Sequence, residues 1–227
     1  MPPHRASALL DLTTLTGQET DEEIDALCER AARHGVAAVC VYGRYVARAA
    51  GHGVRVAAVA NFPEGDLDAD RAARESAAAV DAGAQEVDVV LPWRAWLDGD
   101  SAGALQVVEA ARNATPGTLK VILESGRLGD RVREAADAAL AGGADFVKTS
   151  TGKVGPGASP EAARAMLEAV RDHGSGGFKA SGGVRTREHA EAYLAIADEL
   201  LGPDWATPQT FRIGASSLLD VLLDEDA

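Results

Sequence analysis

The chain has 227 residues, of which 46% are hydrophobic and 25% are charged, a balance typical of a folded domain with its own core. Its formal net charge of −13 at pH 7 argues against a protein that binds nucleic acid or an anionic membrane surface through a basic face. No apolar run approaches the roughly 20 residues that a membrane-spanning helix needs. A small anionic substrate remains compatible with this charge if positive groups are concentrated in one pocket.

The first fifteen residues and the two cysteines bear on the compartment. Segment 1–15 lacks the apolar stretch and small-residue cleavage site of a secretory signal. Cys28 and Cys40 form no C-x-x-C pair, so we expect reduced thiols rather than a structural zinc site. Both observations predict a cytoplasmic protein.

Eight strand-like runs alternate with amphipathic helical segments along the chain. This alternation favours a parallel sheet covered by helices, and eight units in this length match a single (β/α)8 TIM barrel. A doubly wound open sheet is the alternative, but no G-x-G-x-x-G motif follows the first strand. No linker or low-complexity segment divides the chain, so we predict one domain over 1–227. The expected strands are 8–12, 36–42, 54–60, 86–91, 119–124, 145–149, 177–180 and 211–215.

Capping signals mark the helices between these runs. Thr20 and Glu23 have the spacing of a capping box at the start of the helix after the first strand. Ser159 followed by Pro160 predicts the start of the helix after the sixth strand. Several helices end in glycine shortly before the next strand, as Gly35 does in "RHGVAAV".

Ionisable residues occur inside or at the end of five strand-like runs, where an unpaired charge is costly. Any one of them could belong to a structural ion pair. Five at corresponding places favour an active site at the carboxyl ends of the strands, where barrel enzymes place their catalytic residues. These residues are Asp11, Asp88, Glu124, Lys148 and Lys179.

The two lysines are notable because the chain has only four lysines against eighteen arginines. Lys148 and Lys179 lie in the sixth and seventh strands, which should be neighbours roughly 5 Å apart. Burial and mutual repulsion should lower the pKa of at least one amine, and a neutral amine attacks carbonyl carbons. Arginine stays protonated and could not do so. Asp88, from the fourth strand, could move protons around the resulting carbinolamine and imine.

Turns after the last two strands predict an anion site. Backbone N–H groups of glycine turns and helix starts bind phosphate, and barrels commonly hold a phosphate in these two loops. Lys153, in "TGK", could reach the same anion from the loop after the sixth strand. The residues of the two turns are Gly182, Gly183, Gly214, Ser216 and Ser217.

Taken together, these motifs make the chain resemble the DeoC-type, deoxyribose-phosphate aldolase family of Schiff-base-forming barrels. The lysine motifs in this order are specific to that family. The matching segments run almost end to end: "LDLTTL" (10–15), "AVCVY" (38–42), "NFPEG" (61–65), "EVDVVLPWRA" (86–95), "LKVILESG" (119–126), "ADFVKTSTGK" (144–153), "GFKASGGVRT" (177–186) and "FRIGASSLL" (211–219).

The resemblance implies reversible cleavage of 2-deoxy-D-ribose 5-phosphate to acetaldehyde and D-glyceraldehyde 3-phosphate, without metal or organic cofactor. It implies that Lys148 forms the imine, and that Lys179 lowers the pKa of Lys148 and shares a proton relay with Asp88. A homodimer or homotetramer is also expected, since many relatives form one. The implied pocket residues are Asp11, Thr13 and Cys40 for the sugar, and Lys153, Gly182, Gly183, Gly214, Ser216 and Ser217 for the phosphate.

Two other functions are possible on the same barrel. A phosphosugar isomerase or epimerase on the same barrel would use Asp88 as its base, but it does not need two buried lysines. A non-catalytic sugar-phosphate sensor descended from an aldolase predicts the loss of Lys148 or Asp88, and both are present.

Overall fold

The computed structural model describes residues 7–224. The ends of the predicted domain, 1–6 and 225–227, therefore lie outside the described residues, as does the start of the segment assessed for a secretory signal. Within the described part, no helix is both long enough and apolar enough to span a membrane.

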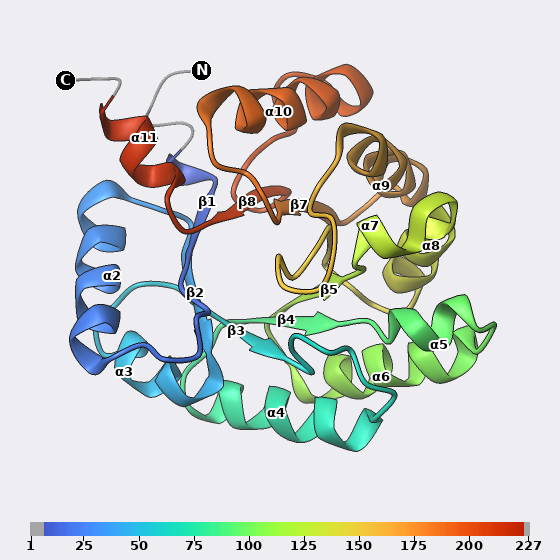
Figure 1. Cartoon of the computed structure of the whole chain (residues 1–227), viewed down its shortest axis with the longest axis horizontal. Coiled ribbons are helices and arrows are strands. Elements are labelled where there is room, and N and C mark those ends of the chain that lie inside the picture. The colour runs from blue at the N-terminus through green and yellow to red at the C-terminus, as the bar shows by residue number, and fades with distance from the viewer. Residues whose placement is uncertain (1–6, 225–227) are drawn as a thin grey trace.

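Eight parallel strands close into a barrel in chain order, with β8 pairing to β1 (Figure 1). The predicted TIM barrel is confirmed, and the alternative of an open sheet is wrong. The expected and observed strand ends agree to within two residues. The strands are β1 (Leu10–Thr13), β2 (Ala38–Tyr42), β3 (Val56–Ala60), β4 (Glu86–Val90), β5 (Thr118–Ile122), β6 (Phe146–Lys148), β7 (Gly177–Ser181) and β8 (Phe211–Ala215).

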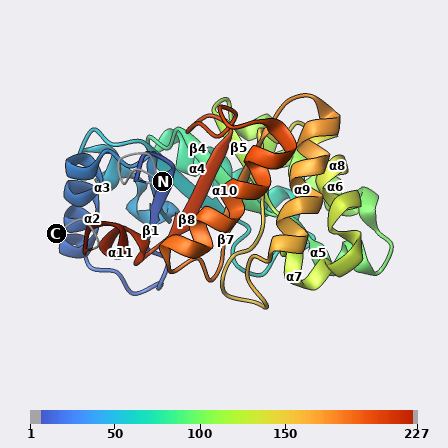
Figure 2. The same cartoon turned by 90° about the horizontal axis from the view of Figure 1, so that it is seen from above.

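Helices surround the barrel. Figure 2 shows α9 and α10 side by side along its outer wall, where the two helices contact each other. The α-helices are α2 (Asp21–His34), α3 (Val46–Ala50), α4 (Ala69–Asp81), α5 (Trp93–Leu97), α6 (Ser101–Ala114), α7 (Ser125–Leu128), α8 (Val132–Ala141), α9 (Pro160–His173), α10 (Arg187–Leu201) and α11 (Leu218–Asp224). Two short 3-10 helices are η1 (Gly43–Tyr45) and η2 (Gly129–Arg131).

The predicted capping signals are confirmed at both helices. At α2, the Thr20 hydroxyl accepts the N–H of Glu23 at 3.3 Å, and the Glu23 carboxylate accepts the N–H of Thr20 at 2.8 Å. This helix ends at Gly35, whose φ of 61° is the left-handed conformation that glycine adopts without steric cost. At α9, the Ser159 hydroxyl accepts the N–H of Ala162 at 3.2 Å.

The strands are buried on both faces, and β4 shows how this arises. Val87 and Val89 belong to the apolar core, whereas Glu86 and Asp88 alternate with them and are equally buried. Because successive side chains of a strand point to opposite faces, the polar set occupies the barrel interior. A charged side chain there is removed from water and needs a charged partner.

Candidate active site

Seven ionisable side chains occupy the barrel interior, and none is more than 4% exposed. We call this group the axial cluster. It brings together four sequence-predicted residues and three that were not predicted as site residues. Its members are Asp11 of β1, Glu86 and Asp88 of β4, Lys120 of β5, Lys148 of β6, Lys179 of β7 and Arg212 of β8.

The upper part of the axial cluster joins the two predicted lysines through one carboxylate oxygen. Lys148 and Lys179 lie directly opposite each other in the β6–β7 register, as expected for neighbouring strands. Their Nζ atoms lie 2.7 and 2.8 Å from Oδ2 of Asp88. Lys179 also donates to Oδ2 of Asp11 at 2.5 Å. A proton on either amine is therefore one hydrogen bond away from Asp88.

The lower part of the cluster contains the residues that sequence analysis did not assign to the site. Lys120 donates to Oδ1 of Asp88 at 2.7 Å and to Oε2 of Glu86 at 2.5 Å. Arg212 donates to Oδ1 of Asp11 at 2.5 Å and to Oε1 of Glu86 at 2.9 Å. Each carboxylate of the cluster therefore contacts at least two cationic groups.

The cations of the cluster divide into two classes by pKa. Burial lowers the pKa of Lys148, repulsion from Lys179 adds to this, and attraction to Asp88 does not offset both. Burial would also lower the pKa of Lys179, but the carboxylates of Asp11 and Asp88 raise it above its usual value. The pKa of Lys120 is likewise raised, because attraction to nearby carboxylates outweighs burial. Lys148 is thus the amine that loses its proton most readily.

The carboxylates respond in the opposite direction. Burial alone would raise the pKa of Asp88, but electrostatic attraction to the neighbouring lysines Lys120, Lys148 and Lys179 brings it well below its usual value. The pKa of Asp11 falls to about 2, because Lys179, Lys120 and Arg212 outweigh the effect of burial. Both side chains are carboxylates at neutral pH.

Charge balance explains why one amine can be neutral. The cluster holds three carboxylates, those of Asp11, Glu86 and Asp88, and they are matched by the cations of Lys120, Lys179 and Arg212. A proton on Lys148 would add an unmatched positive charge in a dry interior. The arrangement is balanced when Lys148 is neutral.

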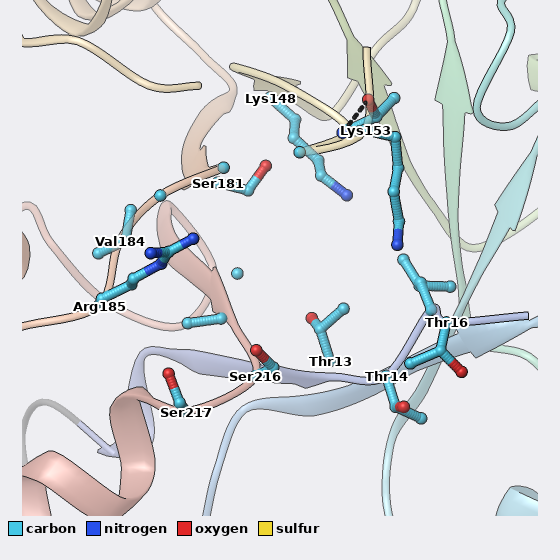
Figure 3. Close-up of a pocket in the computed structure, with 17 residues that line it drawn as sticks. Thr13, Thr14, Thr16, Lys148, Lys153, Ser181, Val184, Arg185, Ser216 and Ser217 are labelled. Atoms are coloured by element: carbon cyan, nitrogen blue, oxygen red, sulfur yellow. Dashed lines mark hydrogen bonds between the residues drawn. The ribbon is translucent and has the colours of Figure 1, made fainter. Parts of the chain in front are cut away.

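A cavity of about 260 Å³ opens above Lys148 at the carboxyl ends of the strands. Figure 3 shows Lys148 and Lys153 extending into it from one side, with Arg185 on another side and Thr13 and Ser216 along a third. Eight of the twelve predicted site residues line this cavity: Thr13, Lys148, Lys153, Gly182, Gly183, Gly214, Ser216 and Ser217.

The other four predicted residues are buried and do not line the cavity. Asp11, Asp88 and Lys179 belong to the axial cluster beneath it. Cys40 is also buried, with its Sγ 4.0 Å from Oδ2 of Asp88, and burial raises the pKa of its thiol. Its position places an uncharged thiol against the catalytic candidates.

Gly214 has a second role in the structure besides lining the cavity. A Cβ atom at this position would lie 2.9 Å from Cε of Lys179 and 3.0 Å from Cβ of Ser181. Glycine therefore leaves the space that the Lys179 side chain occupies inside the barrel.

Glu124, expected at the catalytic end of the fifth strand, does not line the cavity. It follows β5 and its carboxylate accepts the backbone N–H of Thr151. Four other residues of the site were not predicted from the sequence: Lys120, Glu86, Arg212 and Arg185. The first three are ionisable residues inside strands, the signal used for the other candidates, and Arg185 lies two residues after Gly183 of the predicted glycine turn.

Acidic residues of the barrel interior do not form a metal site. Among residues 7–224, no group of three or more His, Cys, Asp or Glu side chains is arranged to hold a metal ion. The three carboxylates of the axial cluster are separated by the ammonium and guanidinium groups that pair with them.

Comparison with solved structures finds close matches to aldolases. A candidate deoxyribose-phosphate aldolase from Coccidioides immitis is 32% identical with a TM-score of 0.87, over 99% of this chain and 87% of its own. Another from Toxoplasma gondii ME49 is 29% identical with a TM-score of 0.89, over 98% and 94%. A tetrameric deoxyribose phosphate aldolase from Aeropyrum pernix is 26% identical with a TM-score of 0.82, over 99% and 92%.

The sequence also matches a family of aldolases over nearly its whole length. The profile of the DeoC/LacD family aldolases aligns with residues 5–223. This range contains every strand of the barrel and every member of the axial cluster. The chain therefore belongs to the DeoC/LacD family of aldolases.

Proposed function

We propose that the protein is a class I aldolase that reversibly cleaves 2-deoxy-D-ribose 5-phosphate to acetaldehyde and D-glyceraldehyde 3-phosphate. The observation that carries the proposal is a buried lysine of lowered pKa, Lys148, beside a cavity that cationic and hydroxyl groups line. The names of the structures compared above support the choice of substrate.

In the first step, the neutral amine of Lys148 attacks C1 of the open-chain sugar. The nitrogen loses a proton to Asp88, whose Oδ2 lies 2.7 Å from Nζ. A carboxyl group of low pKa is a strong acid once protonated, so Asp88 can pass this proton to the C1 oxygen and give the carbinolamine. A second proton, taken up from solvent, converts the C1 hydroxyl into a leaving water, and the nitrogen lone pair forms the protonated imine that joins Lys148 to C1.

The imine then acts as the electron sink for carbon–carbon cleavage. The C3 hydroxyl gives its proton to solvent, the bond between C2 and C3 breaks, and the electron pair of that bond forms an enamine. D-glyceraldehyde 3-phosphate leaves. Protonation of the enamine at its terminal carbon and hydrolysis of the imine release acetaldehyde and regenerate Lys148. Lys179 stays cationic and holds Asp88 and Asp11 in place throughout.

The phosphate is held in what we call the anion pocket, the part of the cavity lined by loops after β6, β7 and β8. Arginine and lysine side chains with serine hydroxyls and turn N–H groups are the usual ligands of a phosphate. Holding the phosphate at this end orients C1 toward Lys148. The pocket consists of Lys153, Gly182, Gly183, Arg185, Ser216 and Ser217.

The chemistry of Asp88 argues against the isomerase alternative. An isomerase needs a base that removes a proton from carbon, and such a base works best with a pKa near the working pH. The lysine side chains around Asp88 hold its pKa well below that range. Asp88 suits proton return to a hydroxyl better than removal of a proton from carbon.

The proposal extends to assembly, cofactors and location. We propose a cytoplasmic homo-oligomer that needs no metal and no organic cofactor. The Aeropyrum pernix structure, which is tetrameric, supports the oligomeric part. Light scattering of the purified protein tests it, and activity that survives a metal chelator tests the absence of a metal requirement.

The central test of function is a coupled assay with 2-deoxyribose 5-phosphate, in which alcohol dehydrogenase and NADH report released acetaldehyde. Wild-type protein should consume NADH, and the Lys148→Met variant should not. Folded wild-type protein that leaves the sugar phosphate intact would contradict the proposal.

A further inference from the structure

Glu124 is a buried charged residue that the proposed mechanism does not use. Its side chain is 1% exposed, and its φ of 54° is in the left-handed region that residues with a Cβ seldom adopt. Such a conformation costs free energy and persists where surrounding contacts require it. The contacts of Glu124 indicate which segment of the chain its side chain keeps in place.

The Glu124 carboxylate contacts the loop that carries the lysine of the anion pocket. Its Oε1 accepts the backbone N–H of Thr151, and Oγ1 of Thr151 accepts the backbone N–H of Lys153 at 3.1 Å. Two hydrogen bonds therefore connect a buried carboxylate to the backbone of Lys153. Both Thr151 and Lys153 line the cavity.

The first turn after Glu124 adds a second attachment to the same loop. Arg127 of α7 donates to the carbonyl oxygen of Val154 at 2.5 Å. A Cβ on Gly126 would collide with the carbonyl oxygen of Pro156, so α7 packs against the loop without space for a side chain. The segment from Thr151 to Pro156 is thus fixed along α7.

The far side of the loop rests on the glycine turn of the anion pocket. Ala158 donates its N–H to the carbonyl oxygen of Gly182 at 2.9 Å. A Cβ on Gly157 would overlap that same oxygen. The loop between β6 and α9 is therefore held between α7 and the turn that contributes Gly182 to the pocket.

We propose that Glu124, with Arg127, is a positioning residue that fixes the β6–α9 loop so that Lys153 and the Gly182 turn form one anion site. The inference rests on the proposed function, because it assigns the site to the phosphate of the substrate. Glu124 touches no reacting atom. Its loss should weaken binding of the phosphate and leave the imine chemistry on Lys148 intact.

The experiment compares 2-deoxyribose 5-phosphate with 2-deoxyribose in wild type, Glu124→Ala and Glu124→Gln. Glu124→Ala removes the acceptor for the Thr151 N–H, and we expect KM for the phosphorylated sugar to rise about tenfold with kcat nearly unchanged. kcat/KM for the unphosphorylated sugar should stay within about twofold. Glutamine retains a carbonyl acceptor, so Glu124→Gln should recover most of the loss.

A matched control and a second variant complete the design. Glu134, on α8, has a side chain that is 57% exposed and pairs with Arg131. Glu134→Ala should therefore leave kcat and KM unchanged for both sugars. Arg127→Met removes the hydrogen bond to Val154 and should raise KM for the phosphorylated sugar about threefold. If Glu124→Ala does not fold, Glu124→Gln and Arg127→Met still decide the result.

Several outcomes overturn the inference. One is an equal fall of kcat/KM on both sugars in Glu124→Ala, since that is general loss of structure. Another is a ratio of the two kcat/KM values, for the phosphorylated and the unphosphorylated sugar, that is the same in Glu124→Ala as in wild type. If wild type cleaves neither sugar, the proposed function fails on its own. Calorimetry with inorganic phosphate then tests the loop separately, and equal affinity in wild type and Glu124→Ala would reject the positioning role.

Discussion

The axial cluster and the anion pocket lie next to each other and are built in opposite ways. Every member of the cluster stands on a strand and is almost fully buried, so the barrel register fixes its geometry. The anion pocket stands on loops, and Lys153, Arg185, Ser216 and Ser217 are exposed. The difference suggests that the barrel places pKa-shifting chemistry in its dry interior and recognition on its loops.

Two lysines of the axial cluster, Lys148 and Lys179, should respond differently to replacement. Replacing Lys148 with Met should lower kcat/KM on the order of 10⁴-fold or more, because no other group can form the imine. The neutral amine leaves no unmatched charge when it is removed, so the free energy of unfolding should change by less than about 1 kcal/mol. Steady-state kinetics and urea unfolding measure the two effects, and a strongly destabilised Lys148→Met would contradict a neutral Lys148.

The neighbouring lysine should behave differently. Lys179→Met removes a buried cation that Asp11 and Asp88 share, so we expect a loss of about 3–5 kcal/mol in the free energy of unfolding. Activity should fall as well, since Asp88 loses one of the two cations that hold it. Urea unfolding beside Lys148→Met is the check. If the two variants had the same free energy of unfolding, Lys148 and Lys179 would carry the same charge in the wild-type protein, which contradicts the assignment.

The lower part of the cluster can be tested by pH. Lys120→Met removes a cation and leaves the surroundings of Lys148 more negative, which raises the pKa of that amine. Because the neutral amine is the reactive form, the acidic limb of the kcat/KM profile should move to higher pH. For each unit by which the pKa of Lys148 rises, the fraction of neutral Lys148 at a pH below that pKa falls about tenfold.

Lys153→Met is the control for this pH experiment, since the side chain belongs to the anion pocket. Its acidic limb should stay where the wild type has it. A Lys120→Met profile that stays in place, or moves to lower pH, would show that charge balance in the cluster does not set the pKa of Lys148.

Smaller effects are expected in the anion pocket. Lys153→Met and Arg185→Met each remove one cation from an exposed site, so KM for the phosphorylated sugar should rise about 10- to 100-fold with kcat little changed. The same kinetics on 2-deoxyribose serve as the comparison. A large fall in kcat for either variant would place that residue in the chemistry rather than in phosphate binding.

The barrel could be predicted because strand and helix signals alternate and the caps are local. Thr20 and Glu23 are three residues apart, and their hydrogen bonds follow from that spacing. The upper cluster was also predictable, since Lys148 and Lys179 lie on consecutive strands, which are usually neighbours.

The lower cluster depends in part on a contact between strands that are far apart in the sequence. Arg212 meets Asp11 only because β8 closes on β1, which joins residues 201 positions apart. Lys120 pairs directly with Asp88 in the β4–β5 register, and because these strands are consecutive, the reasoning that places Lys148 beside Lys179 could also have predicted this contact. The role of Glu124 is hidden for a related reason, because its partner is a backbone N–H in a loop rather than another side chain.

The most direct test of the aldolase proposal is to trap the imine. The protein is incubated with 2-deoxyribose 5-phosphate, reduced with borohydride, digested and examined by mass spectrometry. The neutral amine predicts one adduct, on Lys148, and none on Lys179, Lys120 or Lys153. An adduct on Lys179 would show that charge balance assigns the wrong lysine, and no adduct on folded protein that binds the sugar phosphate would contradict the covalent mechanism.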